Sequence, residues 1–118
     1  MTRRSGGWQA GPRWRITRGK EIALGPGKAD LLEAIGRTGS ISAAGRALGM
    51  SYRRAWLLVA TMNRCFARPL VITSSRRSSG ASLSLDGRRA LAAYRRLETR
   101  SLAATRKVRE ELRRLLRA

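Results

Sequence analysis

Apolar residues recur at helical spacing in the middle of the chain. Leu31, Leu32 and Ile35 fall on one face of a stretch that follows Gly25-Pro26-Gly27, which predicts a helix ending near Arg37. Two more helices are predicted before residue 69. We expect a serine to cap the N-terminus of each and a left-handed glycine turn to join them, at Ser40, Ser51 and Gly49.

Alternating apolar and polar positions predict two short β-hairpins. The first lies within residues 14–24. The second has strands over residues 70–73 and 81–85, and its polar tip contains Arg76 and Arg77. Small sheets of this kind add little to what is otherwise a mainly α-helical chain.

A long helix is predicted from Asp86 onward, because residues 88–118 contain strong helix formers and neither glycine nor proline. Uninterrupted, it would be about 45 Å long. Its apolar stripe consists of Leu91, Tyr94, Leu97, Leu102, Val108, Leu112 and Leu115. A domain of this size covers only part of such a stripe, so we expect the same helix of a second chain to cover the rest. The alternative is a solvated tail after Arg100.

The length of 118 residues suits one domain. We expect a flexible basic arm over residues 1–13, a folded domain over 14–100, and an extension of the dimerisation helix over 101–118. The net charge of +19, from 26 Lys and Arg against 7 Asp and Glu, indicates a polyanionic partner.

The acidic residues are unevenly distributed along the chain. None occurs in residues 34–85, although that stretch contains many arginines: Arg37, Arg46, Arg53, Arg54, Arg64, Arg68, Arg76 and Arg77. A basic surface without carboxylates is what phosphate binding requires. Double-stranded DNA is therefore the expected partner, with an anionic membrane surface or an acidic protein as alternatives.

Several classes of site are excluded by composition. The chain has no histidine and only one cysteine, Cys65, which excludes Cys/His zinc sites, an internal disulfide and histidine-based catalysis. We expect no enzyme activity, no cofactor, no metal and no membrane span. The expected location is the cytoplasm, in association with the nucleoid.

Two short helices joined by a glycine turn and followed by a basic hairpin are typical of a winged helix-turn-helix. Gly45 is small where the two helices are expected to cross. The helix starting at Ser51 is expected in the major groove, and the 74–82 wing on the flanking backbone or minor groove. The candidate DNA-binding residues are Ser40, Ser42, Arg46, Ser51, Tyr52, Arg53, Arg54, Arg76 and Arg77.

Three residues of the predicted recognition helix have two interpretations each. Trp56 is expected to pack inside the domain, the alternative being a base-stacking residue. Tyr52 either contacts DNA or braces the turn. Asn63 is expected to be structural, because it lies at the far end of the helix from the bases; the alternative is a hydrogen bond to a base.

Together these features resemble the DNA-binding domain of ModE-type molybdate-responsive regulators, and more distantly the LysR-type winged helix-turn-helix. The resemblance covers residues 14–100 and rests on Gly39-Ser40-Ile41-Ser42, Gly49 with Ser51-Tyr52, Ala55-Trp56, Met62-Asn63 and the Leu83–Gly87 pattern. It implies a homodimeric transcription regulator of a roughly palindromic operator. It also implies dimer contacts through the last helix and the N-terminal strands.

The chain departs from this family in two respects. Molybdate-sensing members carry a separate C-terminal oxyanion-binding domain, for which we expect no room in these 118 residues, and molybdate binding is therefore not carried over. The family's glycine-rich wing is here rich in arginine and serine.

Three functions agree with the sequence. The first is a sequence-specific dimeric regulator. The second is an architectural, nucleoid-type protein that coats DNA with little sequence preference. The third is an adaptor whose sensor is a separate protein.

Overall fold

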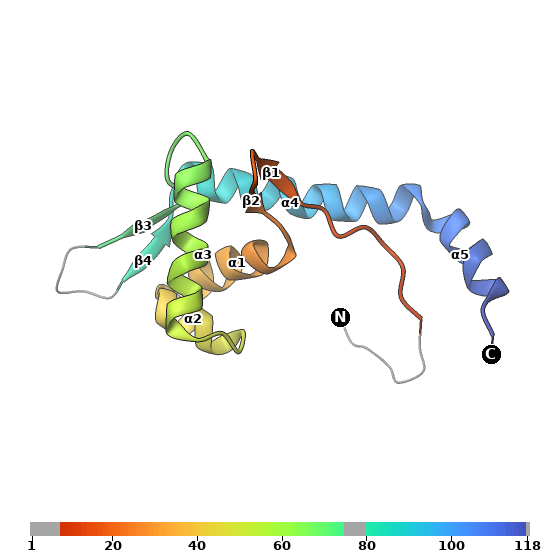
Figure 1. The fold of residues 1–118 in the computed structure, drawn as a ribbon, viewed down its shortest axis with the longest axis horizontal. Helices are drawn as coiled ribbons and strands as arrows, with labels where there is room; N and C mark the ends of the chain where they lie inside the picture. The colour runs from red at the N-terminus through yellow and green to blue at the C-terminus, as the bar shows by residue number, and fades with distance from the viewer. Residues whose placement is uncertain (1–7, 75–79, 118) are drawn as a thin grey trace.

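The computed structural model describes residues 8–74 and 80–117 (Figure 1). This part of the chain is mainly helical with two small antiparallel hairpins, as the sequence predicts. Its elements are β1 (Ile16–Arg18), β2 (Glu21–Leu24), α1 (Pro26–Thr38), α2 (Ile41–Ala47), α3 (Tyr52–Cys65), β3 (Val71–Thr73), β4 (Ala81–Leu83), α4 (Leu85–Ala104) and α5 (Arg106–Leu115).

Local capping sets the limits of α2 and α3. The Ser40 hydroxyl oxygen accepts a hydrogen bond from the backbone N–H of Ala43, and that of Ser51 from Arg54, each at 3.1 Å. Gly49 has φ +72°, a left-handed conformation whose conformational energy is much lower for glycine than for a residue with a Cβ atom. The two serine caps and the glycine turn predicted from the sequence are confirmed.

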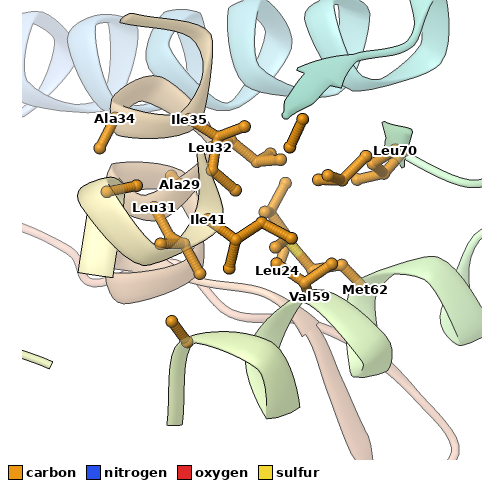
Figure 2. Packing of buried hydrophobic residues seen from close by; sticks show 14 of the residues in the cluster. Leu24, Ala29, Leu31, Leu32, Ala34, Ile35, Ile41, Val59, Met62 and Leu70 are labelled. Atoms are coloured by element: carbon orange, nitrogen blue, oxygen red, sulfur yellow. The ribbon is translucent and has the colours of Figure 1, made fainter. Parts of the chain in front are cut away.

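Helix α1 lies at the centre of the core and packs against α2, α3, α4 and strands of both hairpins. Its Leu31, Leu32 and Ile35 are completely buried (Figure 2). Full burial of one such side chain stabilises the fold by about 1.5–3 kcal/mol. The other elements contribute Leu24, Ile41, Ala44, Ala55, Val59, Met62, Leu70, Val71, Ala81 and Tyr94.

Two glycines allow helices to approach their neighbours closely. A Cβ added at Gly45 of α2 would lie 3.0 Å from the Cβ of Ala55 in α3. One added at Gly87 in the first turn of α4 would lie 2.1 Å from the carbonyl oxygen of Leu70, far inside van der Waals contact. Gly45 therefore permits the predicted close crossing of the two helices, and Gly87 seats α4 against the base of the second hairpin.

The second hairpin is shorter than predicted. Strand β3 pairs Val71 with Leu83 of β4, and the strand we expected over residues 81–85 ends at Leu83. The reason is Ser84, whose hydroxyl oxygen accepts from the Gly87 N–H at 2.9 Å and donates to the Pro69 carbonyl at 2.7 Å. Its capping bond begins α4 at residue 85, one residue before the predicted start.

The prediction of one uninterrupted C-terminal helix is wrong. The helix breaks at Thr105, and α5 leaves the axis of α4 (Figure 1). The hydroxyls of Thr99, Ser101 and Thr105 each donate to the carbonyl four residues earlier, an arrangement that bends helices. The Arg109 guanidinium donates to the Leu102 carbonyl at 2.6 Å, so this oxygen keeps a partner where the helix is interrupted.

The segment before β1 runs beside α4. The indole Nε1 of Trp14 donates to the hydroxyl of Ser101 at 2.8 Å, and the Trp14 carbonyl accepts from the hydroxyl of Tyr94 at 2.8 Å. A Cβ added at Gly11 would lie 3.1 Å from the Leu102 side chain. Residues 11–14 therefore contact the C-terminal half of α4.

We predict that Gly87→Ala destabilises the fold by about 1–3 kcal/mol or more, because the added methyl must displace the Leu70 backbone. Urea unfolding at equilibrium measures the change. The matched control is Gly27→Ala in α1, where nothing lies within 4 Å, and this variant should gain up to about 1 kcal/mol. Equal stability of the two variants would contradict the close approach.

Candidate nucleic-acid interface

The start of α3 presents a group of exposed side chains beside the end of α2. Tyr52, Arg53 and Arg54 are exposed in the first turn of α3, and Arg46 is exposed in the last turn of α2. Among the ion pairs found in residues 8–74 and 80–117, none involves these three arginines. Their guanidinium groups are not neutralised by a carboxylate of the described chain.

Two of the three candidate serines cap helices, and the third lies in the first turn of α2. Ser40 and Ser51 are caps whose hydroxyl oxygens accept backbone hydrogen bonds. A hydroxyl that accepts a bond still has its proton, so each can donate to a phosphate oxygen. Ser42 lies half-buried in the first turn of α2. Ser40 and Ser42 therefore lie at one helix N-terminus, as predicted.

The base of the β3–β4 hairpin is fixed next to this surface. The Ala81 N–H donates to the Gly39 carbonyl at 2.8 Å, and Ser40 forms an isolated bridge with Gly80. The hairpin projects away from the helices, at the end of the molecule opposite α5 (Figure 1). Arg76 and Arg77, the candidate residues of the wing tip, lie outside the described residues.

The acidic side chains lie away from the start of α3. Six of the seven form ion pairs: Glu21 with Arg64, Asp86 with Arg68, Glu110 with Arg113, and Asp30, Glu33 and Glu98 with Arg95. The hydrogen bond from Arg64 lowers the pKa of Glu21 below its ordinary value. None of these six carboxylates pairs with Arg46, Arg53 or Arg54, so the α2–α3 turn keeps its positive charge.

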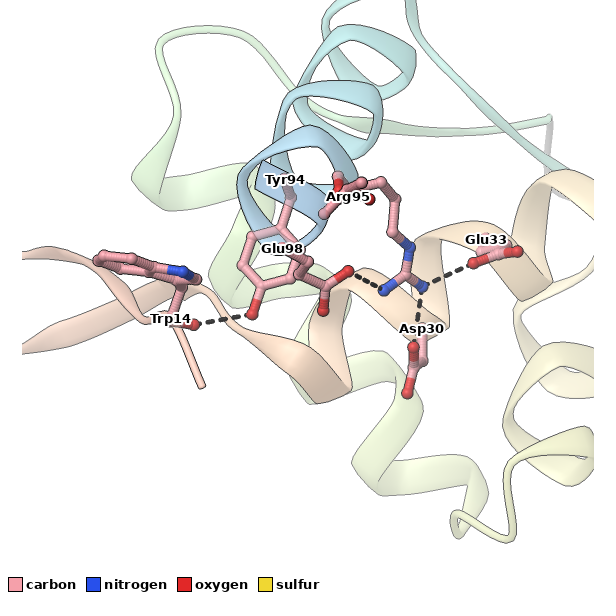
Figure 3. A network of polar contacts seen from close by, with 7 residues as sticks. Trp14, Asp30, Glu33, Tyr94, Arg95 and Glu98 are labelled. Carbon is pink, nitrogen blue, oxygen red and sulfur yellow. Dashed lines mark hydrogen bonds and ion pairs between the residues drawn. The ribbon is translucent and has the colours of Figure 1, made fainter. Parts of the chain in front are cut away.

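Arg95 joins α4 to α1 (Figure 3). One of its terminal nitrogens donates to Asp30 at 2.9 Å and to Glu33 at 2.6 Å, and the other donates to Glu98 at 3.0 Å. Hydrogen bonds to these three carboxylates raise the pKa of Arg95 despite its partial burial. The network fixes the direction of the long helix relative to the helix-turn-helix.

Lys28 adds a further positive charge near the start of α3. It lies in the first turn of α1, where partial burial lowers its pKa and repulsion by Arg54 lowers it further.

Asn63 is structural, as predicted. Its side-chain oxygen accepts hydrogen bonds from the backbone N–H groups of Leu70 and Val71, at 2.9 and 3.1 Å, and its side-chain nitrogen donates to the Val71 carbonyl. The amide thus acts as a pairing partner at the start of β3 and ties the wing to the end of α3. Cys65, in the last turn of the same helix, is buried.

Trp56 is not inside the domain, and the expectation that it would be is wrong. Its side chain is 38% exposed and lies against Tyr52, with ring centroids 6.1 Å apart and planes at 60°. Counting at 100° per residue from buried Ala55 and Val59 places Trp56 at the edge of the buried face. Sequence reasoning also missed Leu57, which is 56% exposed and lies one turn after Arg53.

Comparison with known proteins agrees with this geometry. Residues 28–88 match the family of bacterial regulatory helix-turn-helix proteins of the LysR type. The chain belongs to the LysR-type helix-turn-helix family. The helix-turn-helix of this family implies DNA binding, in agreement with the sequence. The matched residues include all of α2 and α3 and the whole second hairpin.

Two relatives of this LysR-type protein are molybdenum-related. It is 44% identical over 77 residues to the molybdenum-pterin-binding protein MopB of Rhodobacter capsulatus, covering 64% of this chain and 28% of MopB. It is 39% identical over 92 residues to the molybdenum transport protein ModE of Azotobacter vinelandii, covering 76% of this chain and 34% of ModE. The chain thus spans about a third of the length of these relatives, and the resemblance to ModE seen in the sequence is confirmed.

In the described part of the chain, none of the helices has the length and hydropathy needed to cross a membrane.

Proposed function

We propose that this protein is a dimeric winged-helix transcription regulator that reads DNA sequence through α3. The observation that carries the proposal is the exposed, acid-free start of α3, with Arg53 and Arg54 beside Arg46 of α2. The turn held by Gly49 and the close crossing at Gly45 support placing α3 in the major groove, with α2 crossing the backbone.

The candidate residues divide between base and phosphate contacts. Arg53 lies opposite the buried face of α3, where an arginine can grip the O6 and N7 atoms of guanine. Arg54, exposed in the first turn of α3, and Arg46, exposed in the last turn of α2, contact phosphates. Ser40, Ser42 and Ser51 add hydroxyl or backbone donors to the phosphate contacts.

The wing and the two ends of the chain are assigned roles from the sequence. The 74–82 wing, with Arg76 and Arg77, contacts the flanking backbone or minor groove. Residues 1–13 act as a basic arm, 14–100 as the DNA-binding domain and 101–118 as an extension of the dimer contact. The protein acts on the chromosome, in the bacterial cytoplasm.

Dimerisation is proposed from an unpartnered apolar face on α5. Val108, Leu112 and Leu115 recur at i, i+4 and i+7, and they are 60%, 57% and 78% exposed. Strand β1 is exposed along its length, and its Ile16 side chain is 39% exposed, which supports a contribution of the N-terminal hairpin. A second copy that pairs along α5 removes these side chains from water.

The net charge of +19 favours a second candidate function, an architectural protein that coats DNA. Both functions give salt-sensitive binding. For six to ten phosphate contacts per dimer, the logarithm of affinity should fall with the logarithm of salt concentration with a slope of about −5 to −9.

Selection of bound fragments from a random DNA pool, at physiological salt, separates the two functions. We expect one inverted-repeat motif with half-sites about one helical turn apart. Arg53→Ala should relax the choice of base at one position of each half-site, at a cost of about 1–3 kcal/mol for the preferred base, while binding to random DNA changes little. The control Arg89→Ala, on exposed α4, should keep the motif. Tight binding without any motif would favour the coating function.

The dimer is tested by light scattering at micromolar concentration. We expect twice the mass of the 13.1 kDa chain for the natural sequence. Leu112→Glu should give monomers, because the pairing face would bury a carboxylate. The control is Leu85→Glu, which changes a leucine of similar exposure, 54%, at the start of α4, the end far from α5. This variant should remain dimeric. A monomeric natural protein would contradict the proposal.

A further inference from the structure

The outward face of α3 carries apolar side chains among its arginines. Tyr52, Trp56 and Leu57 are 64%, 38% and 56% exposed, and we call these three residues the α3 apolar patch. A single exposed leucine is ordinary on a protein surface. Here three large apolar side chains are exposed within six residues of one helix in a strongly charged chain. Such a group indicates a binding surface.

Helical geometry places Leu57, one member of the α3 apolar patch, where the DNA bases are expected. Ala55, Val59 and Met62 are buried and define the inner side of α3. At 100° per residue, Arg53 and Leu57 fall on the opposite side, one turn apart. Leu57 therefore faces the same direction as the arginine proposed to contact a base, one turn further along α3.

The aromatic part of the patch borders this line of residues. The Trp56 ring lies against Tyr52 one turn earlier, with centroids 6.1 Å apart, and this contact restricts the orientation of the indole. At 100° per residue, Trp56 lies about 60° from Arg53 around the helix. Leu57 lies on the other side of Arg53 around the helix.

The charge around the patch identifies the occupant. Residues 34–85 contain no carboxylate, and Arg46, Arg53 and Arg54 surround the patch without forming ion pairs in the described chain. This setting attracts a polyanion, and duplex DNA exposes one apolar group on the base edges of its major groove, the C5-methyl of thymine.

We propose that Leu57, with Trp56 beside it, contacts thymine methyl groups in the major groove and so makes α3 select thymine next to the base that Arg53 reads. This inference rests on the proposed function and deepens it. The arginine recognises hydrogen-bonding groups and the α3 apolar patch recognises a methyl, so adjacent base pairs are read by different chemistry.

Replacing thymine by uracil tests the proposal, since uracil keeps the Watson–Crick edge and lacks only the methyl. In the motif recovered by selection, each thymine is changed singly to deoxyuridine and the affinity is measured at fixed salt. The natural protein should lose about fourfold in affinity for each methyl that it buries. Leu57→Ala should bind the thymine and uracil duplexes equally at the position that Leu57 contacts.

A matched variant and a stability measurement keep the test specific. Leu85→Ala removes a leucine of nearly the same exposure, 54% against 56%, from the start of α4, and it should keep the full preference for thymine. Thermal unfolding should show that Leu57→Ala remains folded, because the side chain is largely in solvent.

The possible failures are distinguishable. A motif that binds equally well with uracil at every position overturns the inference and leaves the proposed function standing. A thymine preference that Leu57→Ala leaves intact also overturns the inference and leaves the proposed function standing. Unchanged DNA binding by Leu57→Ala has the same meaning, and it would assign the patch to a protein partner. Tight binding without any motif overturns the sequence-specific function and this inference together.

Discussion

The structure depends on the burial of one face of α1. Ala29, Leu31, Leu32, Ala34 and Ile35 are at most 1% exposed, and they contact elements from both halves of the domain. The helix packs against α2 and α3 on one side and against α4 and the hairpin strands on the other. The positions of the recognition helix, the wing and the long helix are thus all set against one element.

Charge distribution follows from this arrangement. Carboxylates and arginines pair where elements meet, as in the Arg95 network between α1 and α4 and the Glu21–Arg64 pair between β2 and α3. Exposed pairs of this kind contribute little to stability, about 0–1 kcal/mol each. None of these carboxylates pairs with Arg46, Arg53 or Arg54, so the surface that we assign to DNA keeps its positive charge.

Local rules explain the features that were predicted from the sequence. Serine caps, the glycine turn and the small residue at a helix crossing depend on neighbours along the chain, and Ser40, Ser51, Gly45 and Gly49 have the predicted roles. The structural assignment of Asn63 was also correct. Its three backbone hydrogen bonds to the start of β3 required the tertiary structure.

The sequence did not predict features for which two conformations are nearly equal in energy, such as a buried or exposed ring and a continuous or broken helix. Trp56 lies at the boundary of the buried face, so apolar composition favoured the core while the geometry left the ring against Tyr52. The break at Thr105 arises from side-chain hydroxyls that compete for helical carbonyls, although threonine is only slightly unfavourable in a helix. The sequence alone did not indicate a binding role for Leu57. Its exposure becomes informative only together with its position beside Arg53 on a surface without carboxylates.

The central claim is that the outward face of α3 is the DNA surface, and a ¹⁵N–¹H NMR titration with a duplex containing the selected motif tests it most directly. Two indole N–H groups serve as reporters, Trp56 on α3 and Trp14, which is hydrogen-bonded to Ser101 on α4. We expect the Trp56 indole and the backbone amides of Arg53 and Leu57 to shift, while the Trp14 indole stays in place. Shifts confined to Trp14 and α4, with α3 unchanged, would contradict the claim.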